Sequence, residues 1–415
     1  MIDWPEKTLG EICEKITDGA HSSPKSVLIG KPMASVKDLN SFGVDLISAR
    51  KIAEEDYQKL VKQGCKPCIG DVLIAKDGNT ALDTVCVQKE NEDFVLLSSV
   101  AILRPNNREV MPDFLKYYFS NRITISYLKS NFISGAAIPR VVLKDFKKAV
   151  ITLPPLSKQR AIVSVLSALD DKIENNRQMN ETLEEMARAI FKSWFVDFDP
   201  VHAKAAGNAP AHMDAETAAL FPSSFGDDGL PAGWGIKKLE NISDLGWGDL
   251  NTTKKSYVEA GFDAYSASGK DGKLPHFDFE KLGVVLSAIG ANSGRTWLAR
   301  GKWSCIKNTI RFWSKYELTP TVFLFHSTNG RNFWPLRGSA QPFISQGDAR
   351  SQKIVVPGNG EAISFERIVG RYYEKISTNE AENQTLAELR DTLLPKLMSG
   401  EIRVTDAERE VEGAL

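Results

Sequence analysis

Cysteines are few in this sequence, and it has no long apolar run. Its 415 residues include five cysteines, an odd number that fits a reducing compartment better than a disulfide framework. No apolar run approaches the roughly 18 residues of a membrane span, and the charged Asp3, Glu6 and Lys7 leave no apolar block at the N-terminus. We therefore expect a cytoplasmic protein without a secretory signal or a membrane span.

Motifs that carry catalysis, cofactor binding or metal binding are also missing. There is no G-x-G-x-x-G after an expected strand, no G-x-x-x-x-G-K-[ST] phosphate loop, no H-E-x-x-H and no Asn/Asp-Pro-Pro-aromatic motif of the amino-methylating DNA enzymes. Cys65 and Cys68 form a lone C-x-x-C, which favours two ordinary thiols around Pro67 over a metal or redox site. The sequence thus predicts no catalytic site, metal or cofactor in this chain.

The length and the charge distribution indicate several domains. A chain of 415 residues is too long for one core, which stops growing near about 250–300 residues. The net charge of −1 hides two basic blocks, 1–154 and 233–357, where 21 and 17 Lys and Arg oppose 19 and 10 Asp and Glu. Basic blocks suggest a polyanionic partner, although an ordinary solvated surface also explains the small excess in the first block.

An internal repeat organises the chain. At an offset of 203 residues, Val150-Ile-Thr-Leu-Pro154 aligns with Lys353-Ile-Val-Val-Pro357, and Asp171-Lys-Ile-Glu-Asn-Asn176 aligns with Glu374-Lys-Ile-Ser-Thr-Asn379. A period of about 200 residues that occurs twice is a duplicated domain and not a solenoid. Short β-type runs with Gly, Asp and Asn punctuation begin each unit, so we expect an α+β fold of two pseudo-symmetric repeats.

Each repeat ends in a segment with helical periodicity. From Ile162 to Trp194, and again from Phe365 to Leu397, seam residues follow one another at alternating steps of four and three. This narrow heptad seam favours a coiled coil over an ordinary core helix with a broader apolar stripe. We expect the two long helices to pair antiparallel, because a compact two-fold arrangement requires that polarity.

Asparagines at matching places predict the register of this helix pair. If facing residues have numbers that sum to 559, Asn176 faces Asn383 and Asn180 faces Asn379, and buried Asn pairs fix register. The same register places Arg390 against a leucine, which requires the arginine head to reach water. Asp170 lies outside the seam, where we expect a solvated face.

These observations give five segments. They are a first recognition globule at 1–154, a central helix at 155–199, a linker at 200–232, a second globule at 233–357, and a distal helix with a C-terminal tail at 358–415.

Several motifs carry a resemblance to a known family. They include Leu153-Pro-Pro-Leu-Ser-Lys-Gln-Arg160, Phe191-Lys-Ser-Trp-Phe-Val-Asp-Phe-Asp-Pro-Val201 and Leu393-Leu-Pro-Lys-Leu-Met-Ser-Gly-Glu-Ile-Arg403. With the two-unit layout, they resemble the central and distal regions of the specificity subunit of type I restriction-modification systems. The resemblance covers essentially the whole chain but is carried by the helices and is weak inside the globules. The second unit also departs from the first, since it lacks a Ser-Trp-Phe-Val-Asp-Phe-Asp-Pro segment.

The resemblance implies a non-catalytic subunit whose two target-recognition domains each read half of a bipartite DNA site. Its implied partners are double-stranded DNA, modification subunits, which we expect in two copies, and restriction subunits. S-adenosylmethionine, ATP and Mg²⁺ are expected on those partners and not on this chain. The aromatic segment of the central helix supplies candidate partner contacts at Phe191, Trp194, Phe195 and Phe198.

DNA recognition needs contacts to phosphates and to base edges, so basic and polar side chains in turn-rich segments are the candidates. In the first unit they are His21, Lys25, Lys37, Lys76 and Arg140, and in the second unit Lys254, Lys255, Lys270, Lys273, Arg295, Lys307, Arg331 and Arg337. For each of them a solvated surface charge is the competing interpretation.

Two other functions remain open from the sequence alone. One is a coiled-coil interaction scaffold without DNA specificity, and the other is a DNA enzyme, which the missing motifs disfavour. Salt-dependent binding to duplex DNA separates the specificity subunit from the scaffold.

Overall fold

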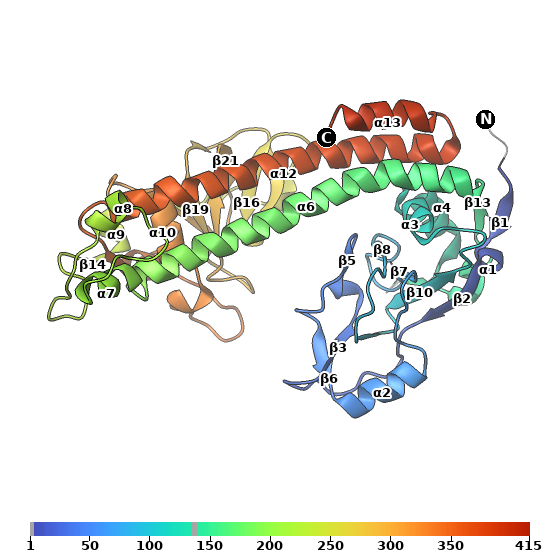
Figure 1. Cartoon of the computed structure of the whole chain (residues 1–415), viewed down its shortest axis with the longest axis horizontal. Coiled ribbons are helices and arrows are strands. Elements are labelled where there is room, and N and C mark those ends of the chain that lie inside the picture. Colours follow the sequence, from blue (N-terminus) through green and yellow to red (C-terminus); the bar gives the residue numbers. More distant parts are fainter. Residues whose placement is uncertain (1–3, 135–138) are drawn as a thin grey trace. The chain divides into compact units, whose positions relative to one another are not determined.

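The structure is a computed structural model that describes residues 4–134 and 139–415, apart from the side chain of Arg331. It divides into two compact units (Figure 1). Unit 1 consists of Met1–Gln178 together with Asn379–Leu415, and unit 2 of Met179–Thr378. Two long helices, α6 (Leu156–Phe195) and α12 (Glu361–Ser399), each contribute one part to unit 1 and the other part to unit 2.

Unit 1 combines small sheets with helices. Its strands are β1 (Glu6–Thr8), β2 (Cys13–Asp18), β3 (Lys31–Ala34), β4 (Leu39–Asn40), β5 (Gly43–Val44), β6 (Arg50–Ile52), β7 (Val72–Ala75), β8 (Val85–Val87), β9 (Val95–Leu96), β10 (Val100–Pro105), β11 (Ile133–Ser134), β12 (Arg140–Val141) and β13 (Val150–Thr152). Its other helices are α1 (Leu9–Ile12), α2 (Glu54–Lys62), α3 (Pro112–Ser120), α4 (Arg122–Phe132), α5 (Leu143–Phe146), α13 (Val404–Glu412) and the 3₁₀ turn η1 (Val36–Asp38).

Unit 2 repeats this pattern. Its strands are β14 (Gly235–Lys238), β15 (Ser243–Trp247), β16 (Phe262–Ser266), β17 (Gly269–Leu274), β18 (Phe279–Glu280), β19 (Gly283–Ser287), β20 (Thr296–Ala299), β21 (Lys302–Cys305), β22 (Thr309–Ser314) and β23 (Lys353–Val356). Its other helices are α7 (Asp199–Ala205), α8 (Ala215–Leu220), α9 (Leu239–Ile242), α10 (Thr321–Thr328), α11 (Gln346–Ser351) and the 3₁₀ turns η2 (Lys254–Ser256) and η3 (Arg331–Phe333).

The same central sheet occurs in both units, which confirms the predicted α+β repeat. In unit 1 the strand order is β2-β10-β7-β8, in unit 2 it is β15-β22-β19-β20, and all neighbouring strands are antiparallel. A two-stranded sheet also recurs, as β1-β13 and as β14-β23. These matched elements lie where the sequence repeat places them.

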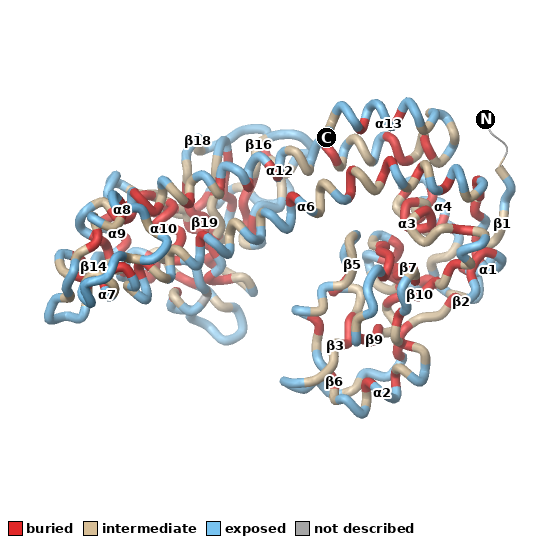
Figure 2. Tube along the Cα trace, in the orientation of Figure 1, coloured by how far each residue is buried: buried red, intermediate tan, exposed pale blue. Residues whose placement is uncertain are grey.

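The central strands are buried on both faces, as Figure 2 shows for β7, β10 and β19. In β7 of unit 1, Val72 and Ile74 belong to one apolar cluster, whereas Leu73 on the opposite face belongs to a second cluster. Successive side chains of a strand point to opposite faces, so a run without polar residues is needed where both faces are covered. This explains the apolar Val72-Leu-Ile-Ala75 run.

Within each unit, α6 and α12 pack side by side and antiparallel, as predicted. In unit 1 the Asn176 amide donates to the Asn383 amide oxygen at 2.9 Å, which confirms this predicted pair. In unit 2 the rings of Phe191 and Trp194 contact the ring of Phe365, with centroids 5.7 and 6.3 Å apart. The helix ends match their sequences, because α6 begins after two prolines and α12 is followed by Gly400, whose φ of +71° suits glycine.

The segment 200–232, expected to be a linker, packs into unit 2. It contains α7 and α8, and its Val201 and Phe221 are buried. The ring of Phe221 meets that of Trp194 edge to face, with centroids 5.3 Å apart. The segment is therefore part of the hydrophobic core of unit 2.

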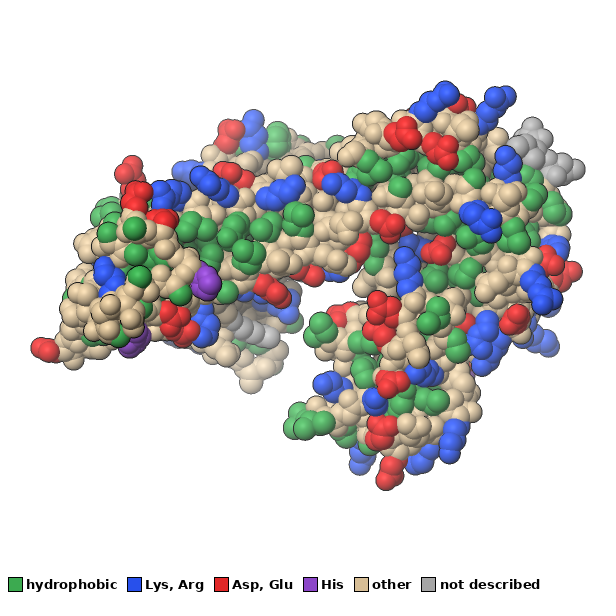
Figure 3. Space-filling view, in the orientation of Figure 1, with side chains coloured by type: hydrophobic (Ala, Val, Ile, Leu, Met, Phe, Trp, Pro, Cys, Tyr) green, Lys and Arg blue, Asp and Glu red, His purple; other side chains and the backbone are tan. Residues whose placement is uncertain are grey.

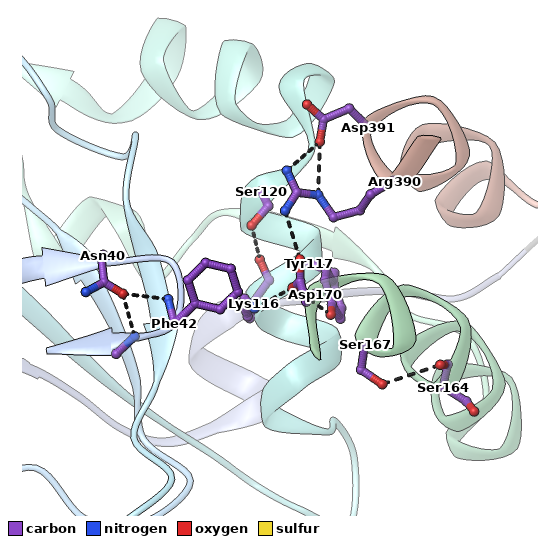
Figure 4. Close-up of polar contacts among 11 residues, drawn as sticks. Asn40, Phe42, Lys116, Tyr117, Ser120, Ser164, Ser167, Asp170, Arg390 and Asp391 are labelled. Carbon is purple, nitrogen blue, oxygen red and sulfur yellow. Dashed lines mark hydrogen bonds and ion pairs between the residues drawn. The ribbon is translucent and has the colours of Figure 1, made fainter. Parts of the chain in front are cut away.

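A buried ion network corrects our expectation for Asp170 and Arg390 in unit 1 (Figure 4). The Asp170 carboxylate accepts hydrogen bonds from Lys116 at 2.8 Å, from the Tyr117 hydroxyl at 2.9 Å and from Arg390 at 2.8 Å. Asp170 is buried, and the Arg390 head turns to it and to Asp391 instead of extending to water. Helix periodicity placed Asp170 outside the seam correctly, but that side of α6 faces α3 and not solvent.

The charges in this network offset the cost of burial. Burial alone would raise the pKa of Asp170, but Lys116 and Arg390 outweigh it and hold that pKa below its usual range. In unit 2 the place of Asp170 in the repeat is taken by Tyr373, whose hydroxyl lies 3.0 Å from Nε2 of the buried His326. Both units thus place a buried polar pair between the helix pair and the preceding globule.

Within residues 4–134 and 139–415, none of the helices is both long and apolar enough to cross a membrane.

Candidate nucleic-acid interface

Three of the predicted DNA-binding residues of unit 1 come together at one edge of its central sheet. His21 follows the end of β2, Lys76 follows the end of β7, and Arg140 begins β12. Two acidic residues at the same strand ends, Asp18 and Asp77, connect them. The sequence separation of these five positions hides this proximity, because only the antiparallel pairing of β2, β10 and β7 brings the strand ends together.

The cluster is a continuous chain of ion pairs. Lys76 lies 3.0 Å from the Asp18 carboxylate and 3.5 Å from that of Asp77. Asp18 also accepts from His21 at 3.2 Å, and Asp77 lies 3.2 Å from Nε of Arg140. The side chains of His21 and Arg140 are 77% and 61% exposed, whereas that of Lys76 is only 6% exposed. His21 and Arg140 are therefore open to a ligand, and Lys76 instead holds the two carboxylates in place.

Lys76 corrects the sequence interpretation in this respect. The sequence makes Lys76 a candidate DNA contact because it is a basic residue in a turn-rich segment. Its burial and its two carboxylate partners leave it no access to a phosphate. Asp18 and Asp77, which position the exposed residues, were not predicted, although both stand next to a glycine in a turn.

Lys25 and Lys37 belong to other segments of unit 1. Both are exposed, Lys25 in the loop before β3 and Lys37 in η1. Their positions suit contacts that do not require a fixed geometry, such as those to phosphates.

Five lysine candidates of unit 2 surround the β16-β17 hairpin and its neighbouring loops. Lys270 and Lys273 are on β17, and the η2 loop with Lys254 and Lys255 is tied to this hairpin by a hydrogen bond from the Val258 amide to the Lys273 carbonyl. The Lys307 amide donates to the Thr252 carbonyl at 3.2 Å, which brings Lys307 to the same loop. The structure thus gathers this part of the positive charge of unit 2 around one hairpin.

Lys254 has a defined partner in that group. It pairs with Asp271, which also accepts from the hydroxyls of Tyr257 at 2.8 Å and Ser266 at 2.7 Å. Burial would raise the pKa of Asp271, but the hydrogen bonds from Lys254 and the two hydroxyls lower it overall. Lys270 lies 3.7 Å from Asp263, while Lys255 and Lys307 are exposed and Lys273 is half-buried.

The other arginine candidates of unit 2 lie at the edge of its central sheet. Arg295 is exposed in the turn before β20, and Arg337 pairs with Asp348 while its side chain stays 62% exposed. Hydrogen bonds from Ser345 and the charge of Arg337 lower the pKa of Asp348, although burial opposes them. The side chain of Arg331 lies outside the described residues.

On the face shown in Figure 3, Lys and Arg side chains are mixed with Asp and Glu on both units. This surface does not form one uniformly basic field, so net charge alone does not mark the interface.

The predicted partner contacts of the central helix lie in the core of unit 2. Trp194 and Phe195 are each 6% exposed, and Phe191 and Phe198 are half-buried. The Phe195 ring packs against those of Phe323 and Phe365, with centroids 5.0 and 5.5 Å apart. Core packing explains Trp194 and Phe195, which corrects the expectation of a partner contact at these two residues, whereas partner contacts at Phe191 and Phe198 stay a prediction.

Of the predicted register residues, Asn176 is buried and pairs with Asn383, and Asn176 also donates to Glu382 at 2.8 Å. Asn180 and Asn379 fall on opposite sides of the boundary between the units, Asn180 half-buried and Asn379 buried. Their pairing stays a prediction.

The described residues contain no group of three or more His, Cys, Asp or Glu arranged to hold a metal ion. All five cysteines are free thiols. Cys65 is buried and Cys68 is exposed, and burial raises the pKa of Cys65. What the site does contain is exposed cations paired with carboxylates.

Comparisons with known proteins agree with this arrangement. Residues 1–185 match the model of the type I restriction modification DNA specificity domain. The chain is 26% identical to the HindI type I restriction enzyme specificity subunit of Haemophilus influenzae, over 97% of this chain and 100% of that protein. It is 24% identical to the MjaIX type I specificity subunit of Methanocaldococcus jannaschii, over 72% of this chain and 70% of that protein.

A solved structure has a similar fold. The crystal structure of the type I restriction-modification S subunit from M. genitalium superposes with a TM-score of 0.55 at 16% identity, covering 95% of this chain and 96% of that one. The sequence matches confirm the resemblance to type I specificity subunits, and the solved structure shows that the fold is similar.

Proposed function

We propose that this chain is the DNA specificity subunit of a type I restriction-modification complex, in which each unit reads one half of a bipartite duplex target. The observation that carries this proposal is the duplicated central sheet, with candidate DNA-binding residues at its strand ends in both units. A target of two separate halves needs two recognition surfaces, and a duplicated domain supplies them.

The charge of the surface supports a polyanionic partner. Phosphate contacts from exposed Lys and Arg supply a sequence-independent part of the affinity, and contacts to base edges supply specificity. Around β16-β17, Lys255 and Lys307 are exposed cations of the first kind. At the edge of the unit 1 sheet, Arg140 forms an ion pair with Asp77, which favours one orientation of its guanidinium toward a base.

The proposal assigns the chemistry to other subunits. Two modification subunits would transfer methyl groups from S-adenosylmethionine, and restriction subunits would use ATP and Mg²⁺, while this chain selects the site and catalyses nothing. If the chain alone transferred labelled methyl groups from S-adenosylmethionine to DNA, the non-catalytic role would be wrong.

The main experiment exchanges one unit at a time. Residues 233–357 are replaced by the matching segment of a relative with a different target, and the methylated sites of the assembled complex are mapped. We expect one half of the target to change while the other half and the spacing stay the same. A change of both halves together would contradict the assignment of one half-site to each unit.

A scaffold without DNA specificity makes a different prediction. Its complex would bind duplexes of any sequence equally, whereas a specificity subunit should prefer one target at every salt concentration, with an affinity that falls as salt rises. Competition between target and random duplexes at two salt concentrations separates the two functions.

A further inference from the structure

The two units have the same backbone conformation at the edge of the central sheet, where the DNA-binding candidates of unit 1 gather. After β7, the Lys76 amide donates to the Ser99 carbonyl, and the Gly78 amide donates to the Pro139 carbonyl at 2.9 Å. After β19, the Ala288 amide donates to the Asn308 carbonyl, and the Gly290 amide donates to the Pro342 carbonyl at 2.9 Å. These matching bonds show that Lys76 and Ala288 occupy equivalent positions in the two units, as do Gly78 and Gly290.

The equivalence extends through the loop and into the adjoining hairpin. Leu82 has a φ of +69° at the place where unit 2 has Gly294 with a φ of +91°, so both loops use a left-handed residue there. In the hairpin, Arg140 bridges to Asp77, and Phe343 bridges to Ile289 in the same way. The frame that presents these side chains is thus the same in both units.

The side chains on this frame have opposite character. Unit 1 carries four charged residues where unit 2 carries four apolar ones, the pairs being Asp18 and Trp247, Lys76 and Ala288, Asp77 and Ile289, and Arg140 and Phe343. Because the apolar set supports the same backbone, the fold does not require the charged set. A buried ion network is costly where an apolar alternative fits, so the charges in unit 1 indicate a function.

In unit 1 the network orients Arg140. Its Nε lies 3.2 Å from Oδ1 of Asp77, an atom that is buried and, within the described part of the chain, accepts no hydrogen bond of good geometry. Lys76 lies 3.5 Å from the same oxygen, so that two cations share this carboxylate. An arginine held through Nε can present its two terminal nitrogens together, which is the geometry that matches O6 and N7 of guanine in the major groove.

In unit 2 the same place is apolar and accessible. Phe343 is 38% exposed and Ile289 is half-buried beside it. An apolar side chain in the major groove recognises the methyl group of thymine. The nearby Arg337, which bridges to Phe343 through the backbone, supplies a cation next to this apolar surface.

We propose that Arg140 and Phe343 are the equivalent base-reading residues of the two units, Arg140 contacting guanine and Phe343 the thymine methyl group, both from the major groove. This proposal rests on the proposed function and adds that the two half-sites are read by different chemistry. Asp77, Lys76 and Asp18 are positioning residues, since they act through Arg140.

Modified bases test the proposal directly. The complete complex with its modification subunits first selects its target from randomised duplexes. Single guanines of the half-site read by unit 1 are then replaced by 7-deazaguanine, which lacks the N7 acceptor, and single thymines of the other half-site by deoxyuridine, which lacks the methyl group. Affinities are measured for the parent and for complexes with Arg140→Ala, Arg140→Lys and Phe343→Ala.

We expect one guanine replacement to weaken binding of the parent about tenfold or more, the value of a hydrogen bond to a charged group. We expect one thymine replacement to weaken it about fourfold, the value of one methyl group. Arg140→Ala should lose the response to 7-deazaguanine and keep the response to deoxyuridine, and Phe343→Ala should do the reverse. Arg140→Lys keeps the charge but not the planar fork, so its response to 7-deazaguanine should be weaker than that of the parent.

Matched controls remove an exposed side chain elsewhere in the same unit. Lys144→Ala in unit 1 and Tyr316→Ala in unit 2 should keep both responses. If Arg140→Ala weakened binding to every duplex equally and kept the 7-deazaguanine response, Arg140 would be a phosphate contact and the inference would be overturned, while the proposed function would stand. If the parent complex selected no target from the randomised duplexes, the proposed function itself would fail.

Discussion

Replacing Asp170 by asparagine should strongly destabilise unit 1. The substitution keeps the size of the side chain but removes the negative charge that Lys116 and Arg390 share at 2.8 Å each. Their side chains are only 10% and 24% exposed, so neither cation gains full hydration after the change. Breaking a buried ion pair by removing one partner costs about 3–5 kcal/mol. In a unit of this size, each kcal/mol lowers Tm by about 2–4 °C, so the unit 1 transition should fall by about 6–20 °C.

The matched control is Asp171→Asn. Asp171 is the next residue on α6 and is exposed, so the same chemical change should alter stability by less than about 0.5 kcal/mol. Thermal unfolding gives the overall effect. Hydrogen exchange analysed by mass spectrometry then assigns it, because amides of α3 should lose protection while those of the unit 2 strand β19 should not.

A triple variant tests whether the unpaired charge, and not the change of side chain itself, causes the loss of stability. Replacing Asp170, Lys116 and Arg390 together by apolar residues of similar length should recover most of the lost stability, since no unpaired charge stays buried. If Asp170→Asn were as stable as Asp171→Asn, the network would contribute nothing and our account of the contact between α3 and the helix pair would be refuted.

Three further outcomes follow from other parts of the chain. Burial lowers the pKa of His326 to about 3, whereas in the unfolded state its pKa is near 6.5, so the unfolded state binds more protons below about pH 6.5. Unit 2 should therefore lose about 2 kcal/mol of stability between pH 7.5 and pH 5. Denaturant titrations of His326→Phe should show a flatter dependence on pH. Phe195→Ala should destabilise unit 2 by about 3–5 kcal/mol because it leaves a cavity among aromatic rings, and an unchanged unfolding midpoint would contradict its place in the core. Seven residues inserted before Asn176 and seven after Asn383 keep the seam in phase and add about 10 Å of helix. If the helix pair sets the distance between the two half-sites, methylation mapping should find a spacer about three base pairs longer, or no methylation. An unchanged spacer at full activity would contradict this role of the helices.

The helix pair could be predicted from sequence because it depends on local periodicity. A seam with alternating steps of four and three residues determines which side of each helix is buried, and one asparagine pair is enough to set the register. The sequence repeat predicted the duplicated sheet for a similar reason, since equal spacing of equal motifs leaves little freedom for different folds.

The ion clusters could not be predicted in the same way. Asp18, Lys76 and Asp77 meet because three strands end at one edge, and strand order is not visible in the residues themselves. The burial of Asp170 could not be predicted for the same reason. Periodicity shows that Asp170 lies outside the seam, but it does not show that α3 covers that side of α6. The burial of Phe195 could not be predicted from the sequence either, because its core partner Phe323 lies far away in the sequence.

Unit 1 consists of two stretches of chain that are separated by the whole of unit 2. Leu386, Leu393 and Leu397 of α12, with Val411 of α13, lie in the same apolar cluster as Ile162 and Leu166 of α6. During synthesis on the ribosome, the residues of unit 2 are therefore all made before those that complete unit 1.

Unit 2 should then close first and unit 1 last, although the synthesis of unit 1 begins first. At about 5–20 residues per second, the apolar side of Leu156–Gln178 waits about 10 s or more for its partner helix. In that interval a second nascent copy, or the corresponding stretch of α12 from another molecule, offers the same seam. The completion of unit 1 is therefore a late step, in which its last helix packs against a side of α6 that is made before the whole of unit 2.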